Sequence, residues 1–136
     1  MVVPLTLEET ARFHGHKGPW LVVGYKAGLR ALEVLGSGIR CSVRLPLTTP
    51  YTCLVDGIQC SSGCTLGKGL IEVLEGDENS ILIVFRSEGG KTLELKLRRG
   101  LADTIKKLID SLGVERAGEV VEKWSCDQIF EERLYP

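Results

Sequence analysis

The sequence predicts an α+β fold, in which helices pack on one face of a mostly antiparallel sheet. Apolar residues recur at helical spacing at about residues 7–35 and 101–124. Between these regions, short apolar runs are separated by turn-forming residues, which is typical of strands. The expected core is helix, strand, helix and three strands, followed by C-terminal helices, in a single domain of residues 1–136.

The first helix is expected over residues 7–13. Thr6 is a suitable N-cap, and Glu9 lies three residues beyond it, so the two can form a capping box. This helix would deliver His14 at its C-terminal end.

The second helix is expected over residues 20–35, with Pro19 in its first turn and Gly36 at its end. Its apolar residues lie on more than one face. The helix should therefore be central in the fold or half covered by a partner subunit.

The middle of the chain should form strands around one helix. Residues 41–47 alternate with a period of two, and Pro46 limits that strand to an edge or an end. A helix should follow from Cys53 to about Gln59. Turn-forming residues then divide three further strands, at residues 70–74, 81–86 and 92–98. The last of them alternates leucines with charged residues, which predicts a sheet with one solvent-facing side.

The C-terminal part is expected to be helical. Residues 101–112 carry apolar side chains at helical spacing and end at Gly113, and another helix should cover about residues 115–124. The tail, at about residues 125–136, is too apolar to stay unpacked. We expect it to pack on the body of the domain or on a partner subunit.

Composition argues against several classes of protein. The net charge is −1, without the basic excess of a nucleic-acid binder. The N-terminus lacks a signal-peptide pattern, and no apolar run is long enough to span a bilayer. We therefore expect a cytoplasmic protein with no nucleic-acid or membrane partner. Five cysteines, an odd number at irregular spacing, favour free thiols or metal ligands over disulfides.

Two histidines lie close together in the chain. His14 and His16 are separated by one glycine, and both rings point to one side if the backbone there is extended. Metal binding or catalysis is one interpretation. The other is ordinary capping and packing, because histidines at helix ends often bind backbone carbonyls.

Three thiols form the second group. Cys53, Cys60 and Cys64 are spaced seven and four apart, so they would share one face of an unbroken helix. Each alone could be a small core residue. Glycines around Lys68, however, would let the backbone approach a ligand, and the lysine would lower a thiol pKa or bind an anion.

These residues form two motifs. The first is Phe-His-Gly-His at residues 13–16, followed by Pro19 and Gly24, and the second is Cys-Leu-Val-Asp-Gly-Ile-Gln at 53–59 with Gly-Cys-Thr-Leu-Gly-Lys-Gly at 63–69. Together they resemble the FmdE family of formylmethanofuran dehydrogenase subunits. The resemblance implies an α+β core related to the catalytic domain of glyceraldehyde-phosphate dehydrogenase, a metal-associated pocket of His and Cys residues, and a homodimer. It also points to one-carbon metabolism in methanofuran-using microbes.

The sequence departs from the family pattern at two positions. Gly18 replaces a cysteine and Trp20 replaces a glycine, so one thiol of the family pocket is missing. Cys60 stands where the family requires no cysteine, and it is either a substitute ligand or a packed core residue. The zinc-finger extension of some relatives is missing too, because Cys126 is the only cysteine after Cys64.

The leading hypothesis is a metal-binding protein that holds zinc or another divalent ion. His16, Cys53 and Cys64 would be its ligands, with His14 as a fourth ligand or as a group that orients one. In an enzyme, the ion would act as a Lewis acid or activate water, and Lys68 would hold an anionic group. We expect Cys41 to lie apart from this pocket.

Two alternatives stay open. One is a metal-free thiol enzyme, with Cys53 or Cys64 as nucleophile and His14 or His16 as base. The other is a non-catalytic accessory subunit of a larger oxidoreductase complex. In each case we expect a homodimer.

Overall fold

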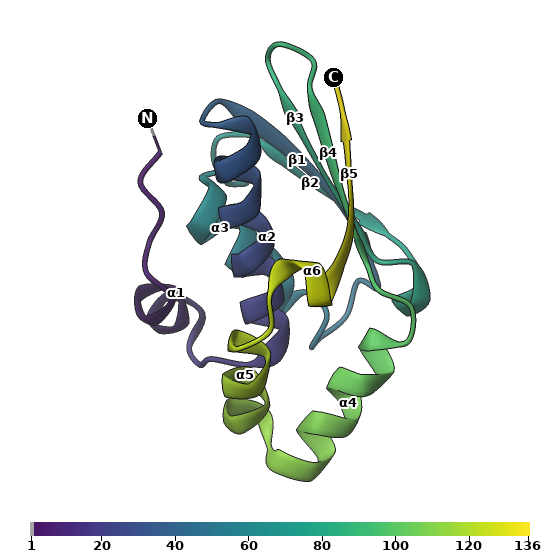
Figure 1. Cartoon of the computed structure of the whole chain (residues 1–136). Coiled ribbons are helices and arrows are strands. Elements are labelled where there is room, and N and C mark those ends of the chain that lie inside the picture. Colours follow the sequence, from purple (N-terminus) through teal and green to yellow (C-terminus); the bar gives the residue numbers. More distant parts are fainter. Residues whose placement is uncertain (1) are drawn as a thin grey trace.

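The computed structural model describes residues 2–136 and has an α+β architecture (Figure 1). Its helices are α1 (Leu7–His14), α2 (Pro19–Leu35), α3 (Cys53–Ser62), the 3-10 helix η1 (Glu78–Ser80), α4 (Leu101–Leu112), α5 (Val114–Glu122) and α6 (Cys126–Ile129). Its strands are β1 (Ile39–Leu45), β2 (Ile71–Glu75), β3 (Leu82–Ser87), β4 (Thr92–Leu97) and β5 (Phe130–Tyr135). The predicted fold class is confirmed.

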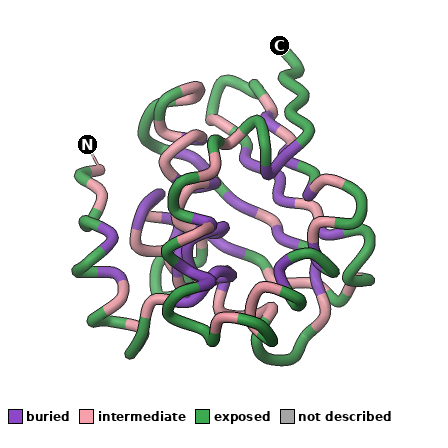
Figure 2. The backbone as a smooth tube through the Cα atoms, turned by 60° about the horizontal axis from the view of Figure 1, so that its bottom comes forward, coloured by how far each residue is buried: buried purple, intermediate pink, exposed green. Residues whose placement is uncertain are grey.

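The five strands form one sheet in the order β2-β1-β3-β4-β5. The β1–β2 pair is parallel, with α3 as the crossover between the two strands, and the other pairs are antiparallel. Leu93, Leu95 and Leu97 on β4 are buried, whereas Lys96 between them is exposed. The alternation therefore gives one covered and one solvent-facing side, as predicted. Figure 2 shows the buried backbone gathered inside the molecule and the exposed backbone around it.

Most element boundaries agree with the sequence, and the differences have local causes. The capping box of Thr6 and Glu9 is present at the start of α1. β1 ends at Leu45, directly before Pro46, which lacks the N–H that a continuing strand needs. α3 continues to Ser62, beyond the predicted end, because Gly63 rather than the serines ends it.

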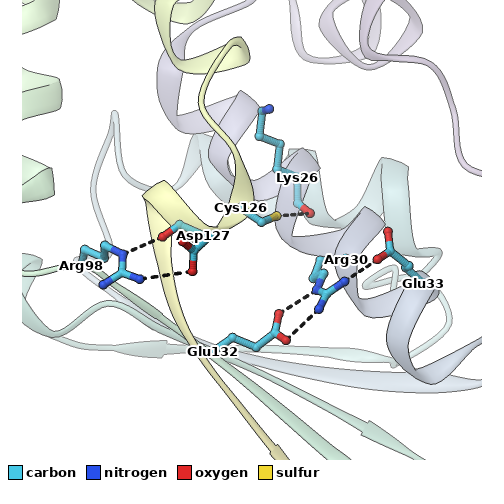
Figure 3. Close-up of polar contacts among 7 residues, drawn as sticks. All are labelled: Lys26, Arg30, Glu33, Arg98, Cys126, Asp127 and Glu132. Carbon is cyan, nitrogen blue, oxygen red and sulfur yellow. Dashed lines mark hydrogen bonds and ion pairs between the residues drawn. The ribbon is translucent and has the colours of Figure 1, made fainter.

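The tail packs on the body, as one of our two expectations had it, but we did not predict its strand. Ile129 and Phe130 are buried, and β5 pairs with β4. Arg30 on α2 donates two hydrogen bonds to the carboxylate of Glu132 on β5, at 2.7 and 2.8 Å (Figure 3). Lys26 Nζ also donates to the carbonyl of Trp124 at 2.6 Å. These contacts fasten the C-terminal segment to α2.

Helices α2 and α3 approach each other through small residues. A Cβ at Gly24 would lie 1.9 Å from the Leu54 carbonyl oxygen, and one at Gly57 would lie 2.2 Å from the Leu21 carbonyl oxygen. One helical turn further along α2, a Cβ at Gly28 would lie 1.9 Å from Ser61 Oγ. The two backbones are therefore in direct contact, and only glycine fits at these positions.

None of the helices within residues 2–136 has the length and apolar composition needed to cross a membrane.

We predict that Gly24→Ala destabilises the protein by about 3 kcal/mol, since its methyl group would collide with backbone. This cost exceeds the gain of about 1 kcal/mol that alanine brings to a helix interior. Urea unfolding measures the difference. Gly67→Ala is the matched control, because nothing lies within 4 Å of its Cβ position. Equal stability of the two variants would contradict the packing described.

We also predict that Glu132→Gln costs about 0.5–1 kcal/mol at neutral pH. The hydrogen bonds from Arg30 lower the pKa of Glu132 below its ordinary value of 4.5. A lowered pKa in the folded state gives stability above the ordinary pKa, and that stability is lost as the pH falls through the lowered value. The difference between wild type and variant should therefore shrink below about pH 4.5. Glu88→Gln, in an exposed turn, should show no such dependence.

Candidate functional site

The candidate site lies where α1 packs against α3. Thr10 and His14 are four residues apart on α1, and Asp56 and Cys60 are four apart on α3. Both spacings put the two side chains of each helix on one face. The His14 ring contacts Asp56, and the Thr10 side chain interacts with the Cys60 thiol. The first histidine and the second motif therefore meet.

His14 forms a close pair with Asp56. Its Nδ1 lies 2.6 Å from Asp56 Oδ2, and only 13% of the His14 side chain is exposed. Gln59 donates to the other carboxylate oxygen at 3.4 Å and accepts from the Leu66 backbone N–H at 2.8 Å. The carboxylate is thus held from two sides.

The other nitrogen of His14 has no hydrogen-bond partner among residues 2–136. Nε2 is buried, and no hydrogen bond reaches it from the described residues. An imidazole that donates from Nδ1 to a carboxylate presents an electron pair at Nε2. A buried polar atom without a partner is costly, which makes Nε2 a candidate position for a ligand.

His16 lies beside His14, with 4.9 Å between the ring centroids and 47° between the ring planes. Its segment is held by α5, because Lys17 pairs with Glu122 at 2.8 Å and Gly118 lets the α5 backbone approach the Lys17 carbonyl. A Cβ at Gly18 would lie 3.4 Å from His16 Nε2. The same Cβ would lie 2.9 Å from Val114 Cγ1, so the absence of a side chain at Gly18 lets Val114 and the imidazole pack closely around this position.

The three thiols do not share one face. α3 ends at Ser62, and Gly63 turns the chain with a left-handed φ of 78°. Cys64 beyond it is buried, and its Sγ donates to the Ile39 carbonyl at 3.3 Å. Burial and the Cys64 thiol together raise the pKa of Cys41. Our expectation that Cys41 lies apart from Cys64 is therefore wrong, since both thiols belong to the core beside β1.

Cys53 and Cys60 remain on the face of α3 that turns towards α1. Burial, followed by the Asp56 carboxylate, raises the pKa of Cys53. Burial also raises the pKa of Cys60, against a hydrogen bond with Thr10 that lowers it. The same holds for Cys64, whose pKa burial raises although Ser62 and Lys68 lower it. No thiol of this group is prepared as a thiolate by its surroundings.

The two remaining positions of interest lie outside the histidine pair. Lys68 is exposed in the loop after α3, on the wall of a cavity that Cys60 and Phe13 also line. Trp20 is buried, and its ring meets the edge of Tyr51 at a centroid distance of 5.1 Å. The bulky ring therefore belongs to the core.

The structure thus joins His14, His16 and Asp56, with Cys53 one helical turn before Asp56. Within residues 2–136, no three His, Cys, Asp or Glu side chains are arranged to hold a metal ion. Sequence reasoning gave Asp56 no role. Asp56 could have been identified from the sequence, because a carboxylate one helical turn after Cys53 lies on the same face of the helix as Cys53.

Two comparisons with known proteins bear on this site. The family model described as "FmdE, Molybdenum formylmethanofuran dehydrogenase operon" matches residues 13–133. A protein of Archaeoglobus fulgidus, described as a probable S-adenosyl-L-methionine-binding protein, is 35% identical over 81 residues. That match covers 56% of this chain and 22% of the relative, so the chain spans about a fifth of the relative's length.

Proposed function

Because this chain belongs to the FmdE family, we propose that it binds a divalent metal, most suitably zinc, and works alongside formylmethanofuran dehydrogenase. The observation that carries the proposal is the buried, unpartnered Nε2 of His14. A histidine that binds a metal through one nitrogen commonly donates from the other to a carboxylate, as His14 does to Asp56.

The donor set supports an open site. The proximity of the two rings, 4.9 Å between their centroids, supports His16 as a second ligand, and imidazole suits zinc and other divalent transition metals. Cys53 is a further candidate ligand, because metal binding can drive the ionisation of a thiol with a raised pKa. We leave Cys64 out of the proposed set, since its thiol is buried against β1.

Few protein ligands leave positions on the ion for water or substrate. A bound divalent ion supplies Lewis-acid chemistry there. In this arrangement His14 and His16 bind, while Asp56 fixes the His14 ring and the proton on Nδ1. Gln59 in turn fixes the carboxylate.

The two alternatives, a metal-free thiol enzyme and an accessory subunit, receive different support. A metal-free thiol enzyme needs a thiolate, whereas burial raises the pKa of all five cysteines. The accessory-subunit role gains support from the operon named in the family description. The proposed metal site and that role are compatible, because the dehydrogenase would supply the redox centre.

The homodimer remains a prediction, and of the two segments expected at its interface the tail keeps exposed apolar side chains. Most of α2 is buried within the chain, and Ile129 and Phe130 of the tail are buried as well. Leu134 and Tyr135 at the end of the tail are, by contrast, 50% and 42% exposed, so they can still contribute to an interface between two copies.

We predict that tag-free protein binds one zinc or cobalt ion per chain, measured by calorimetric titration. His14→Ala should abolish binding, and Asp56→Asn should weaken it by about 10–100-fold, because the ring loses its orienting partner. Cys64→Ala is the control and should bind as the wild type does. Unchanged affinity in His14→Ala would refute the proposed site.

We predict that Gly18→Cys tightens metal binding, because its thiol would stand beside His16 Nε2. The backbone at position 18, with a φ of −102°, accepts any residue. The Cβ would also lie 2.9 Å from Val114 Cγ1, so the variant is best tested in Val114→Ala as well. Bound cobalt should then show sulfur-to-metal charge-transfer absorption. Gly18→Ala adds the Cβ without the thiol, and a similar gain in affinity there would contradict the explanation.

A further inference from the structure

A cavity of about 490 Å³ opens between the N-terminal segment, α1, the end of α3 and the loop that follows it. Its apolar wall includes Val3, Leu5 and Phe13, and its polar side includes Gln59, Cys60 and Lys68. This volume falls within the range of small-molecule sites, which combine an apolar lining with a few polar groups. The cavity therefore has the size and the composition of a ligand site.

The side chains of the apolar wall are exposed to solvent. Val3 is 80% exposed, Phe13 is 65% exposed and Leu5 is 39% exposed. An apolar ligand that covered these side chains would be stabilised by the removal of apolar surface from water. Large apolar side chains that gather at a cavity indicate a surface that binds something apolar.

Hydrogen bonds within the chain hold both walls of the cavity in place. On one side, the Leu5 N–H donates to the Cys60 carbonyl at 3.1 Å, and Tyr25 Oη donates to the Leu5 carbonyl at 2.7 Å. On the other side, the loop that carries Lys68 is held by the bond from the Leu66 N–H to Gln59. A ligand would enter a preformed site and would not have to order these segments.

On the polar side of the cavity, Lys68 supplies the one positive charge among the described lining residues. Lys68 is exposed and forms no ion pair with any of residues 2–136. Gln59, which lines the cavity, donates a hydrogen bond to the Asp56 carboxylate, and that carboxylate contacts His14. Cationic and apolar groups in one cavity match a molecule that has both an anionic group and an apolar body.

We propose that this cavity binds an amphipathic organic anion. Its apolar or aromatic body would lie against Val3, Leu5 and Phe13, and its carboxylate, sulfonate or phosphate group would pair with Lys68. The proposal goes beyond metal binding and does not require an ion at His14. It also gives the Phe-His-Gly-His motif at residues 13–16 a role in binding an organic ligand. Phe13 would contact that ligand, while His14 faces Asp56.

Anilinonaphthalene sulfonate, an aromatic anion, is the probe, and phenylnaphthylamine is its uncharged counterpart. Fluorescence titration of the full chain should show one sulfonate bound per chain. Lys68→Met should weaken sulfonate binding by about tenfold, through loss of one charge pair, and leave the uncharged probe unaffected. Phe13→Ser should weaken both probes. Lys91→Met and Leu47→Ser, exposed positions that do not line the cavity, should change neither.

Alkylation supplies an independent measurement. The sulfonate should slow the reaction of Cys60 with N-ethylmaleimide, while Cys126, outside this cavity, reacts at an unchanged rate. Unaltered sulfonate affinity in Lys68→Met, or unaltered alkylation of Cys60, would overturn the proposal. So would a dimer that Phe13→Ser converts to a monomer, because the cavity would then be an interface between copies. Zinc titration of Lys68→Met should match the wild type, so failure of one proposal is distinguishable from failure of the other.

Discussion

The direct backbone contact between α2 and α3 is the constraint on which the rest of the molecule depends. Helices usually pack about 8–10 Å apart, at a distance set by the side chains between them. Gly24 and Gly57 remove those side chains, so the facing carbonyls of Leu54 and Leu21 set the limit of approach. The helix pair then acts as one rigid layer on the sheet, and the position of α3 determines where its other face points.

The other face of α3 carries residues of the candidate site. α1 has only eight residues, too few to be stable as an isolated helix, so its position depends on caps and on packing. The capping box at Thr6 and the left-handed Gly15 define its ends. Asp56 then fixes its last residue, His14, from α3. The contact that prepares the imidazole for a ligand thus also holds the helix in place.

Sequence reasoning succeeded where a local rule was sufficient. Helix ends at Thr6, Gly36 and Gly113 follow from capping chemistry, and the alternation in β4 follows from its one buried face. It failed where distant segments decide. β5 has charged residues at three consecutive positions, so it shows no alternation, and only its pairing with β4 makes it a strand.

The site was predicted in part for the same reason. The family resemblance implied a pocket of His and Cys residues, whereas the contact that the structure shows between His14 and the second motif is made by Asp56. The spacing of the thiols would unite Cys64 with Cys53 only in an unbroken helix, and the helix expected from the sequence already ended at about Gln59. Gly63 ends that helix within one residue of Cys64, and a left-handed glycine sends the thiol into the core.

The charges on β5 have a consequence for the behaviour of the protein at high concentration. An outermost strand exposes unpaired backbone groups that invite strands of other molecules, the first step towards aggregation. β5 presents Glu131, Glu132 and Arg133 in succession along this edge, and β2 presents Glu72 and Glu75 at the opposite one. A foreign strand that paired with either edge would have to place its own side chains beside these charges. The charged residues that made β5 hard to recognise as a strand in the sequence thus oppose the pairing of a sixth strand with the sheet.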